Sequence, residues 1–172
     1  MLGTDAFGFD GWLGILGGDG GYMAVDPANP RVVYAEMQWA NIRKSNDGGR
    51  TFRSASRGLA SRITSGVCDA SKFLFKSANG GRTWRSLDGT GATGIPDVPI
   101  HAVVVDPDRR GRIYLGTDVG VFVSNDGGDA WAVENTGFGA IVTESLSLAR
   151  DTAGRTWLFA FTHGRGAWKV KN

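Results

Sequence analysis

The chain has few of the features that mark disulfide-rich, membrane-spanning or nucleic-acid-binding proteins. Its single cysteine, Cys68, excludes an internal disulfide and a cysteine-based zinc site. There is no run of about 18 apolar residues, which argues against a membrane-spanning helix. The 19 basic and 17 acidic residues leave a net charge of only +2, and the densest basic cluster, residues 109–112, is short. We therefore expect no nucleic-acid partner and no membrane partner.

Proline is scarce as well, with 5 residues, whereas glycine is abundant, with 27. Abundant glycine with little proline favours short strands joined by tight turns over disorder. Hydrophobic residues make up 41% of the chain and charged residues 21%, which is typical of a soluble globular protein. The first residues show no basic segment followed by an apolar run, so no signal peptide is expected, and the compartment is not predicted.

A segment of eight residues occurs three times, at 45–52 (SNDGGRTF), 77–84 (SANGGRTW) and 124–131 (SNDGGDAW). Such repeats predict an architecture built from one recurring unit. In each copy the acidic or amide side chain can accept hydrogen bonds from its own turn, the glycines permit positive φ, and the aromatic residue can pack beneath. We interpret these residues as structural: Ser45, Asp47, Gly49, Phe52, Ser77, Asn79, Gly81, Trp84, Ser124, Asp126, Gly128 and Trp131.

Strand-like runs surround the repeats and divide the chain into units at about 17–56, 57–90, 96–136 and 137–171. The second unit lacks the Asp-Pro turn found at Asp26 and Asp106 and is predicted to be incomplete. The last unit has three strand-like runs and no repeat, and a lone apolar run at 12–16 precedes the first unit. The pattern predicts an all-β propeller of about four blades, each a four-stranded antiparallel sheet, in which the N-terminal strand completes the last blade. Alternatively, two chains pair their open edges in a homodimer.

The motif Ser-x-Asp-x-Gly-x-Thr-Trp resembles the Asp-box, or BNR repeat. Together with Val-Asp-Pro at 25–27 and 105–107 and the segment THGRGAW at 162–168, it makes most of residues 17–171 similar to Asp-box β-propellers. That group includes sialidases, xyloglucanases and sortilin-type receptors, so the resemblance implies a fold more than an activity. The Ile95-Pro96 pair has no preceding arginine, unlike the sialidase motif, and the material for about four blades suggests a shortened or partial member.

Candidate site residues come from the loops that a propeller gathers on the face opposite the repeated turns. Trp39 can stack on a sugar ring, or else cap the core. His163 and Arg165 can bind an anion, and Asp19 with Asp118 is a carboxylate pair to test for glycoside hydrolysis. The predicted ligand-binding residues are Gln38, Trp39, Asp97, His101, Glu144, His163 and Arg165. No metal and no cofactor is expected.

Two functions follow from these residues. The first is a non-catalytic binding or scaffold propeller for carbohydrate or a protein partner, because no recognisable catalytic set is present. The second is a glycoside hydrolase related to sialidases or xyloglucanases, or a fragment of one. A glycan array together with an aryl-glycoside panel would distinguish the two.

Overall fold

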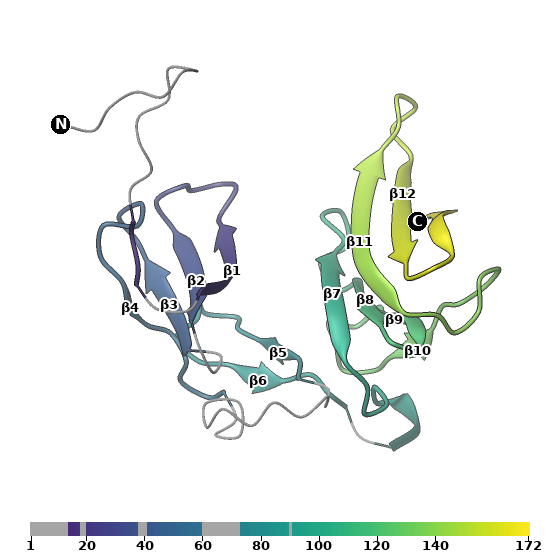
Figure 1. Cartoon of the computed structure of the whole chain (residues 1–172), viewed down its shortest axis with the longest axis horizontal. Helices are drawn as coiled ribbons and strands as arrows, with labels where there is room; N and C mark the ends of the chain where they lie inside the picture. Colours follow the sequence, from purple (N-terminus) through teal and green to yellow (C-terminus); the bar gives the residue numbers. More distant parts are fainter. Residues whose placement is uncertain (1–13, 18–19, 38–40, 60–72, 90) are drawn as a thin grey trace. The chain divides into compact units, whose positions relative to one another are not determined.

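The computed structural model describes residues 14–17, 20–37, 41–59, 73–89 and 91–172 (Figure 1). These residues form β-strands and turns, with a short 3₁₀ helix at Gly91–Thr93. The chain divides into two compact units. The described part of the N-terminal unit comprises residues 14–59 and Ser77–Trp84, and that of the C-terminal unit comprises residues 73–76 and Arg85–Asn172.

The N-terminal unit contains one four-stranded antiparallel sheet. Its strands are β1 (Gly20–Val25), β2 (Val33–Met37), β3 (Asn41–Ser45) and β4 (Arg53–Ser54), paired in chain order. β4 is short because Thr51 donates both its backbone N–H and its hydroxyl to Asp47, which keeps Thr51 in the turn.

The C-terminal unit contains the other three sheets of the described residues. One pairs β5 (Phe75–Lys76) with β6 (Arg85–Ser86), and one joins β7 (Ile100–Val105), β8 (Ile113–Thr117), β9 (Gly120–Ser124) and β10 (Ala132–Val133). The third joins β11 (Thr143–Arg150), β12 (Thr156–Thr162) and β13 (Gly166–Lys171). The predicted all-β class with four-stranded antiparallel sheets is confirmed. Sheet β5–β6 has two strands within the described residues, and the incompleteness of the second unit stays a prediction.

The three Asp-box turns share one hydrogen-bond pattern. In the first, Ser45 Oγ accepts the Gly49 N–H at 2.9 Å and donates to Asp47 at 2.7 Å. Gly49 has a φ of 88°, a conformation that glycine adopts at little cost. The corresponding serine bonds recur at Ser77 and Ser124. The interpretation of the boxes as structural turns therefore agrees with their geometry.

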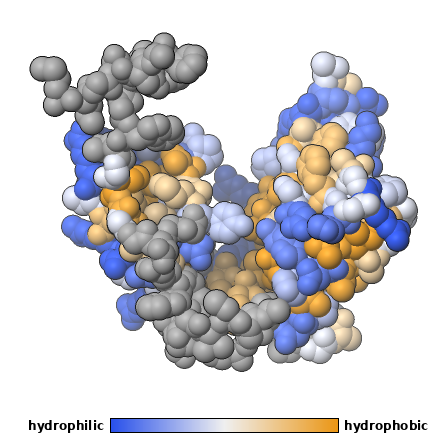
Figure 2. Space-filling model, in the orientation of Figure 1, coloured by the Kyte–Doolittle hydropathy of each residue, from blue (hydrophilic) through white to orange (hydrophobic). Residues whose placement is uncertain are grey.

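Two apolar cores join the sheets of the C-terminal unit. Leu74 and Leu87 pack with Leu115, Phe122 and Trp131 between sheet β5–β6 and sheet β7–β10. A second core lies between sheet β7–β10 and sheet β11–β13. It contains Tyr114, Val121, Leu146, Leu158 and Ala160. Hydrophobic residues also reach the surface of both units (Figure 2).

The predicted strand at 12–16 is only partly within the described residues. Residues 14–16 are not in a strand, and Trp12 and Leu13 lie outside the described part of the chain. Ile15 nevertheless has a defined contact, because a Cβ added at Gly49 would lie 3.1 Å from its Cδ1.

Candidate ligand-binding sites

The first strand of each larger sheet carries an irregularity near its start. Pairing shifts between Gly20 and Met23 in β1, between Ile100 and Ala102 in β7, and between Thr143 and Ser145 in β11. β-bulges re-aim side chains and occur often beside functional sites. In the C-terminal unit the extra residues are His101 and Glu144, both predicted as ligand-binding residues.

Each of these two residues pairs with a partner in the turn between the second and third strands of its sheet. His101 Nε2 lies 2.6 Å from Asp118 Oδ1, and His163 Nδ1 lies 3.6 Å from Glu144 Oε1. The two sheets are neighbours, because a Cβ added at Gly116 would lie 2.6 Å from the Thr143 carbonyl oxygen. The structure thus brings His101, Asp118, Glu144 and His163 to corresponding strand ends of adjacent sheets. We call these four residues the rim pairs.

The other predicted site residues divide into two groups. Asp97 is exposed before β7, and Arg165 is exposed in the turn between β12 and β13, where its carbonyl accepts the Trp168 indole N–H. Asp19, Gln38 and Trp39 lie outside the described residues. The carboxylate pair predicted from Asp19 and Asp118 therefore stays a prediction, as does sugar stacking on Trp39.

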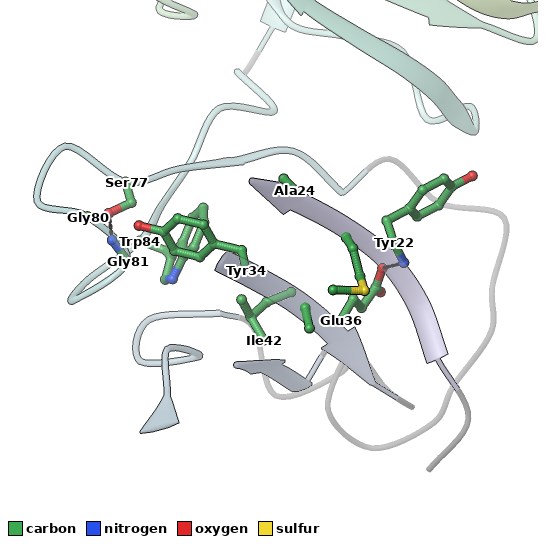
Figure 3. Close-up of a pocket in the computed structure, with 11 residues that line it drawn as sticks. Tyr22, Ala24, Tyr34, Glu36, Ile42, Ser77, Gly80, Gly81 and Trp84 are labelled. Carbon is green, nitrogen blue, oxygen red and sulfur yellow. Dashed lines mark hydrogen bonds between the residues drawn. The ribbon is translucent and has the colours of Figure 1, made fainter. Parts of the chain in front are cut away.

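A second site is a cleft in the N-terminal unit, with a volume of about 430 Å³. β1, β2 and β3 line it together with the second box (Figure 3). Tyr34 and Trp84 lie together at one end, and Tyr22 and Glu36 lie at the other end (Figure 3). The lining is mostly apolar, but Glu36 brings a carboxylate that accepts the Tyr22 backbone N–H at 3.4 Å.

The aromatic end of the cleft is held by the glycines of the second box. A Cβ at Gly81 would lie 3.1 Å from Tyr34 Cε1, so a larger residue there would displace the ring. Lys44 Nζ lies 5.2 Å from the centre of the Tyr34 ring and donates to the Gly80 carbonyl at 2.9 Å. Tyr34 is thus fixed between a cation and a turn, and one face of the cleft is pre-formed.

Within the described residues, no three His, Cys, Asp or Glu side chains are grouped closely enough to hold a metal ion. None of the helical residues there forms a helix long and apolar enough to cross a bilayer.

No protein-family model matches the sequence. The chain is 33% identical over 138 residues to the oligoxyloglucan-reducing end-specific xyloglucanase of Emericella nidulans, an alignment that covers 63% of this chain and 17% of the enzyme. The structure matches an ancestral GH74 enzyme with a TM-score of 0.57 and 17% identity, over 89% of this chain and 24% of that one. The chain is a partial Asp-box β-propeller related to GH74 xyloglucanases.

This partial propeller is also similar to Ycf48 from Cyanidioschyzon merolae, with a TM-score of 0.49 and 16% identity. That match covers 87% of this chain and 54% of Ycf48. The propeller spans less than a fifth of the length of the curated xyloglucanase and about a quarter of the GH74 structure. The similarity therefore covers only part of each of these enzymes.

The sequence indicated the four rim-pair residues as candidates but not their pairing, and their role in binding stays a prediction. It did not indicate the cleft. Tyr34 and Glu36 read as alternating residues of a strand, and Trp84 reads as the aromatic of a box. No local pattern links Tyr34 to Trp84, because their place in one cleft depends on tertiary packing.

Proposed function

We propose that the chain is a non-catalytic carbohydrate-binding propeller whose ligand occupies the cleft of the N-terminal unit. The observation that carries the proposal is the pairing of Tyr34 and Trp84 at one end with Glu36 at the other (Figure 3). A sugar ring offers apolar C–H faces and a rim of hydroxyl groups. Flat aromatic rings fit the faces, and a carboxylate accepts from the hydroxyls. A volume of about 430 Å³ is within the range of small-ligand sites.

The relationship to a xyloglucanase supports a glucan as the ligand class. By its name, that enzyme acts at the reducing end of oligoxyloglucan. An oligosaccharide of that type would lie along β1 and β2, with one ring on Tyr34. The exposed Tyr22, at 84% of its full accessible surface, would contact a further ring.

Binding without catalysis fits the composition of the cleft. Glycoside hydrolysis usually requires two carboxyl groups that flank the scissile bond. Glu36 is the one carboxylate among the described residues that line the cleft. One carboxylate can orient a hydroxyl group, but it cannot supply both the acid and the base.

Isothermal titration calorimetry with xyloglucan oligosaccharides tests the proposal. Tyr22→Ala and Glu36→Gln should each weaken binding about fivefold, since loss of an aromatic or charged contact costs about 1 kcal/mol. Phe161→Ala removes an aromatic side chain that is 45% exposed in the C-terminal unit and should leave the affinity unchanged. Absence of binding to any glycan would overturn the carbohydrate assignment, and unchanged binding by both cleft variants would overturn the site.

The alternative is a glycoside hydrolase, and the rim pairs are the observation in its favour. Asp118 and Glu144 occupy corresponding ends of neighbouring sheets, each beside a histidine. Reducing-sugar release from xyloglucan oligosaccharides tests this alternative. If activity exists, Asp118→Asn and Glu144→Gln should each abolish it, and Asp19→Ala tests the pair predicted from the sequence. No release by the unaltered protein would reject the enzyme.

A further inference from the structure

Sheet β11–β13 of the C-terminal unit has one face turned away from its apolar core. Leu158 and Ala160 of β12 are buried in that core. Trp157 and Phe159 alternate with them along the strand and therefore lie on the opposite face. Lys169 of β13 pairs with Phe159, so its side chain shares that face. The register of the sheet thus brings an ammonium group next to two aromatic rings.

These aromatic and lysine side chains line a groove with a volume of about 250 Å³. The end of β11 and the turn that follows it add three charged side chains to the lining: Arg150, Asp151 and Arg155. One water molecule occupies about 30 Å³ in the liquid, so the groove has the space of roughly eight waters. We call it the β12 groove.

The charges of the β12 groove do not cancel. Arg150 forms an ion pair with Asp108, and these two charges neutralise each other. Asp151 accepts a hydrogen bond from Arg155 Nε at 2.7 Å. Arg155 and Lys169 bring two positive charges against the one negative charge of Asp151. The groove is left with one positive charge, which an anionic ligand would neutralise.

The Trp157 ring orients both positive groups. Lys169 Nζ lies 4.9 Å from the ring centre, and the guanidinium carbon of Arg155 lies 5.8 Å from it. Among the described residues, no carboxylate pairs with Lys169, and the bond from Arg155 to Asp151 uses Nε and leaves both Nη nitrogens without an acceptor. An incoming anion can therefore bind an ammonium and a guanidinium group without breaking an ion pair.

A carboxylate fits these donors better than a phosphate. A guanidinium group can donate two parallel N–H bonds to a carboxylate, whose single negative charge equals the positive charge left in the groove. A phosphate monoester, with a charge of about −2 at pH 7, would exceed that charge and be repelled by Asp151. The groove therefore selects a monoanion.

The space beside the charges favours a ligand larger than a carboxylate alone, which would fill only a small part of the groove. Phe159 is half-buried and offers an apolar ring next to the charged groups. A pyranose ring that carries a carboxylate has C–H groups that can pack on an aromatic ring and hydroxyl groups that can stay in water. A sugar acid therefore matches both the charge and the apolar wall of the groove.

We propose that the β12 groove binds a uronic acid, with the carboxylate between the Arg155 guanidinium and the Lys169 ammonium and the pyranose ring against Phe159. The sugar part of this inference rests on the proposed carbohydrate-binding function, whereas the carboxylate part rests on the groove alone. The groove belongs to the C-terminal unit, and the cleft at Tyr34 belongs to the N-terminal unit. Each site can therefore be tested without the other.

An NMR titration of the isotopically labelled full chain with sodium D-glucuronate tests the proposal. In about 0.15 M salt, which screens distant charges, the Trp157 indole N–H resonance should shift and reach saturation. D-Glucose has a similar ring without the carboxylate and should cause no shift. Sodium acetate has the carboxylate without the ring and should bind more weakly. No response to glucuronate, or equal affinity for glucose or acetate, would overturn the proposal.

Two variants locate the carboxylate. Lys169→Gln removes the ammonium charge and should weaken glucuronate binding about fivefold, the upper range for loss of an exposed ion pair. Arg155→Lys keeps the charge but loses the paired N–H groups, so it should also weaken binding. Lys171→Gln is the matched control, because Lys171 is the next lysine on the same face of β13 and lies outside the groove lining. An equal loss in Lys171→Gln would indicate unspecific attraction and overturn the proposal.

Two further ligands separate this inference from the proposed function. Xyloglucan oligosaccharides are neutral and should not shift the Trp157 resonance, and a shift would overturn the selection of a carboxylate. If they bind the N-terminal cleft and glucuronate gives no response, the groove alone is rejected, and the opposite result supports the groove and rejects the cleft. Tighter binding of an oligogalacturonide than of glucuronate would support the groove as a site for acidic glycans, and a response to glucuronate alone would support it as a site for the free sugar acid.

Discussion

At the residue scale, the second glycine of each box combines backbone conformation with close packing. Gly128 has a φ of 98°, and an added Cβ would lie 2.6 Å from Leu87 Cδ1. Leu87 is itself buried at 4% exposure, so its side chain has little room to move away. The second glycine of the third box is therefore needed for the close packing of Leu87 on that box as well as for the tight turn.

Gly128→Ala should destabilise the chain by about 1–3 kcal/mol, through strain at positive φ and overlap with Leu87. Gly137→Ala is the matched control, since Gly137 has a φ of 96° and nothing within 4 Å of an added Cβ. Urea unfolding followed by tryptophan fluorescence measures both variants. Equal losses would mean that backbone strain alone accounts for the effect.

Asp151 is the acidic residue of a turn that resembles a box without being one. It accepts the Trp157 indole N–H at 3.0 Å and the Arg155 backbone N–H at 2.9 Å. Chiefly through the bond from Trp157, these contacts lower the pKa of Asp151 from 3.8 to about 2. A carboxyl whose pKa is lowered by folding stabilises the fold above its unfolded pKa and loses that contribution as pH falls towards the folded value.

Trp157→Phe should therefore raise the pKa of Asp151 towards 3.8, because the phenylalanine ring has no N–H to donate. Carboxyl chemical shifts followed by NMR between pH 1.5 and pH 5, about the range of the two pKa values, measure this change. The acid-induced loss of stability between about pH 4 and pH 2 should also become shallower in the variant. If the pKa of Asp151 is unchanged in Trp157→Phe, the backbone N–H groups alone are sufficient to keep it low.

At the element scale, Asn172 joins the end of β13 to the β7–β8 turn. Its Nδ2 donates to Asp106 at 2.6 Å, and its Oδ1 accepts from Tyr114 at 2.5 Å and from Arg112 at 2.8 Å. Burial opposes ionisation of Asp106, but the bond from Asn172 and two backbone N–H groups hold its pKa below the usual value. Burial raises the pKa of Tyr114.

Asn172→Ala should cost about 1–3 kcal/mol at pH 7, because it leaves the buried Asp106 carboxylate without one of its donors. Asn125→Ala provides the control, since Asn125 also accepts from Arg112, at 2.7 Å, but lies at the surface. Chemical denaturation should show a larger loss for Asn172→Ala. A larger loss for Asn125→Ala would instead show that the contact of Arg112 with Asn125 contributes more to stability.

The elements that the sequence predicted well are those whose chemistry is local. A box needs eight consecutive residues, so its strand-turn-strand arrangement could be predicted, as could the strands of the last unit. The turn at Asp151 was missed because it lacks the proline of Asp26-Pro27 and Asp106-Pro107. All three aspartates nevertheless accept the N–H of the second residue after them.

For the candidate sites too, single residues could be predicted from the sequence, but contacts between distant residues could not. His101 and Glu144 were predicted as site residues because they were placed near the loops of one propeller face, but their pairing with Asp118 and His163 depends on bulges that single-sequence patterns do not reveal. The cleft at Tyr34 and Trp84 joins residues 50 positions apart, 84 − 34. Only packing of the second box on sheet β1–β4 brings them together.

At the scale of the whole molecule, the described sheets of the C-terminal unit share cores with their neighbours. Leu115 of β8 is fully buried, at 0% exposure, in the core between sheet β5–β6 and sheet β7–β10. Several sheets therefore depend on the packing around one strand.

Leu115→Ala should destabilise the C-terminal unit by about 2–5 kcal/mol, through lost burial and the resulting cavity. Val103→Ala, at a position 55% exposed on the adjacent β7, should cost much less. Thermal unfolding monitored by near-ultraviolet circular dichroism would measure the difference. Similar midpoints for the two variants would place the main core elsewhere.

The indole bonds of the boxes also bear on how such chains change in length. Within the N-terminal unit, Trp84 donates to the Ala55 carbonyl, and Ala55 directly follows β4. Within the C-terminal unit, Trp131 donates to the Leu87 carbonyl, and Leu87 directly follows β6. Ala55 and Leu87 each lie three positions after the aromatic residue of their own box, so an insertion or deletion earlier in a repeat leaves the accepting carbonyl at a fixed distance from that box.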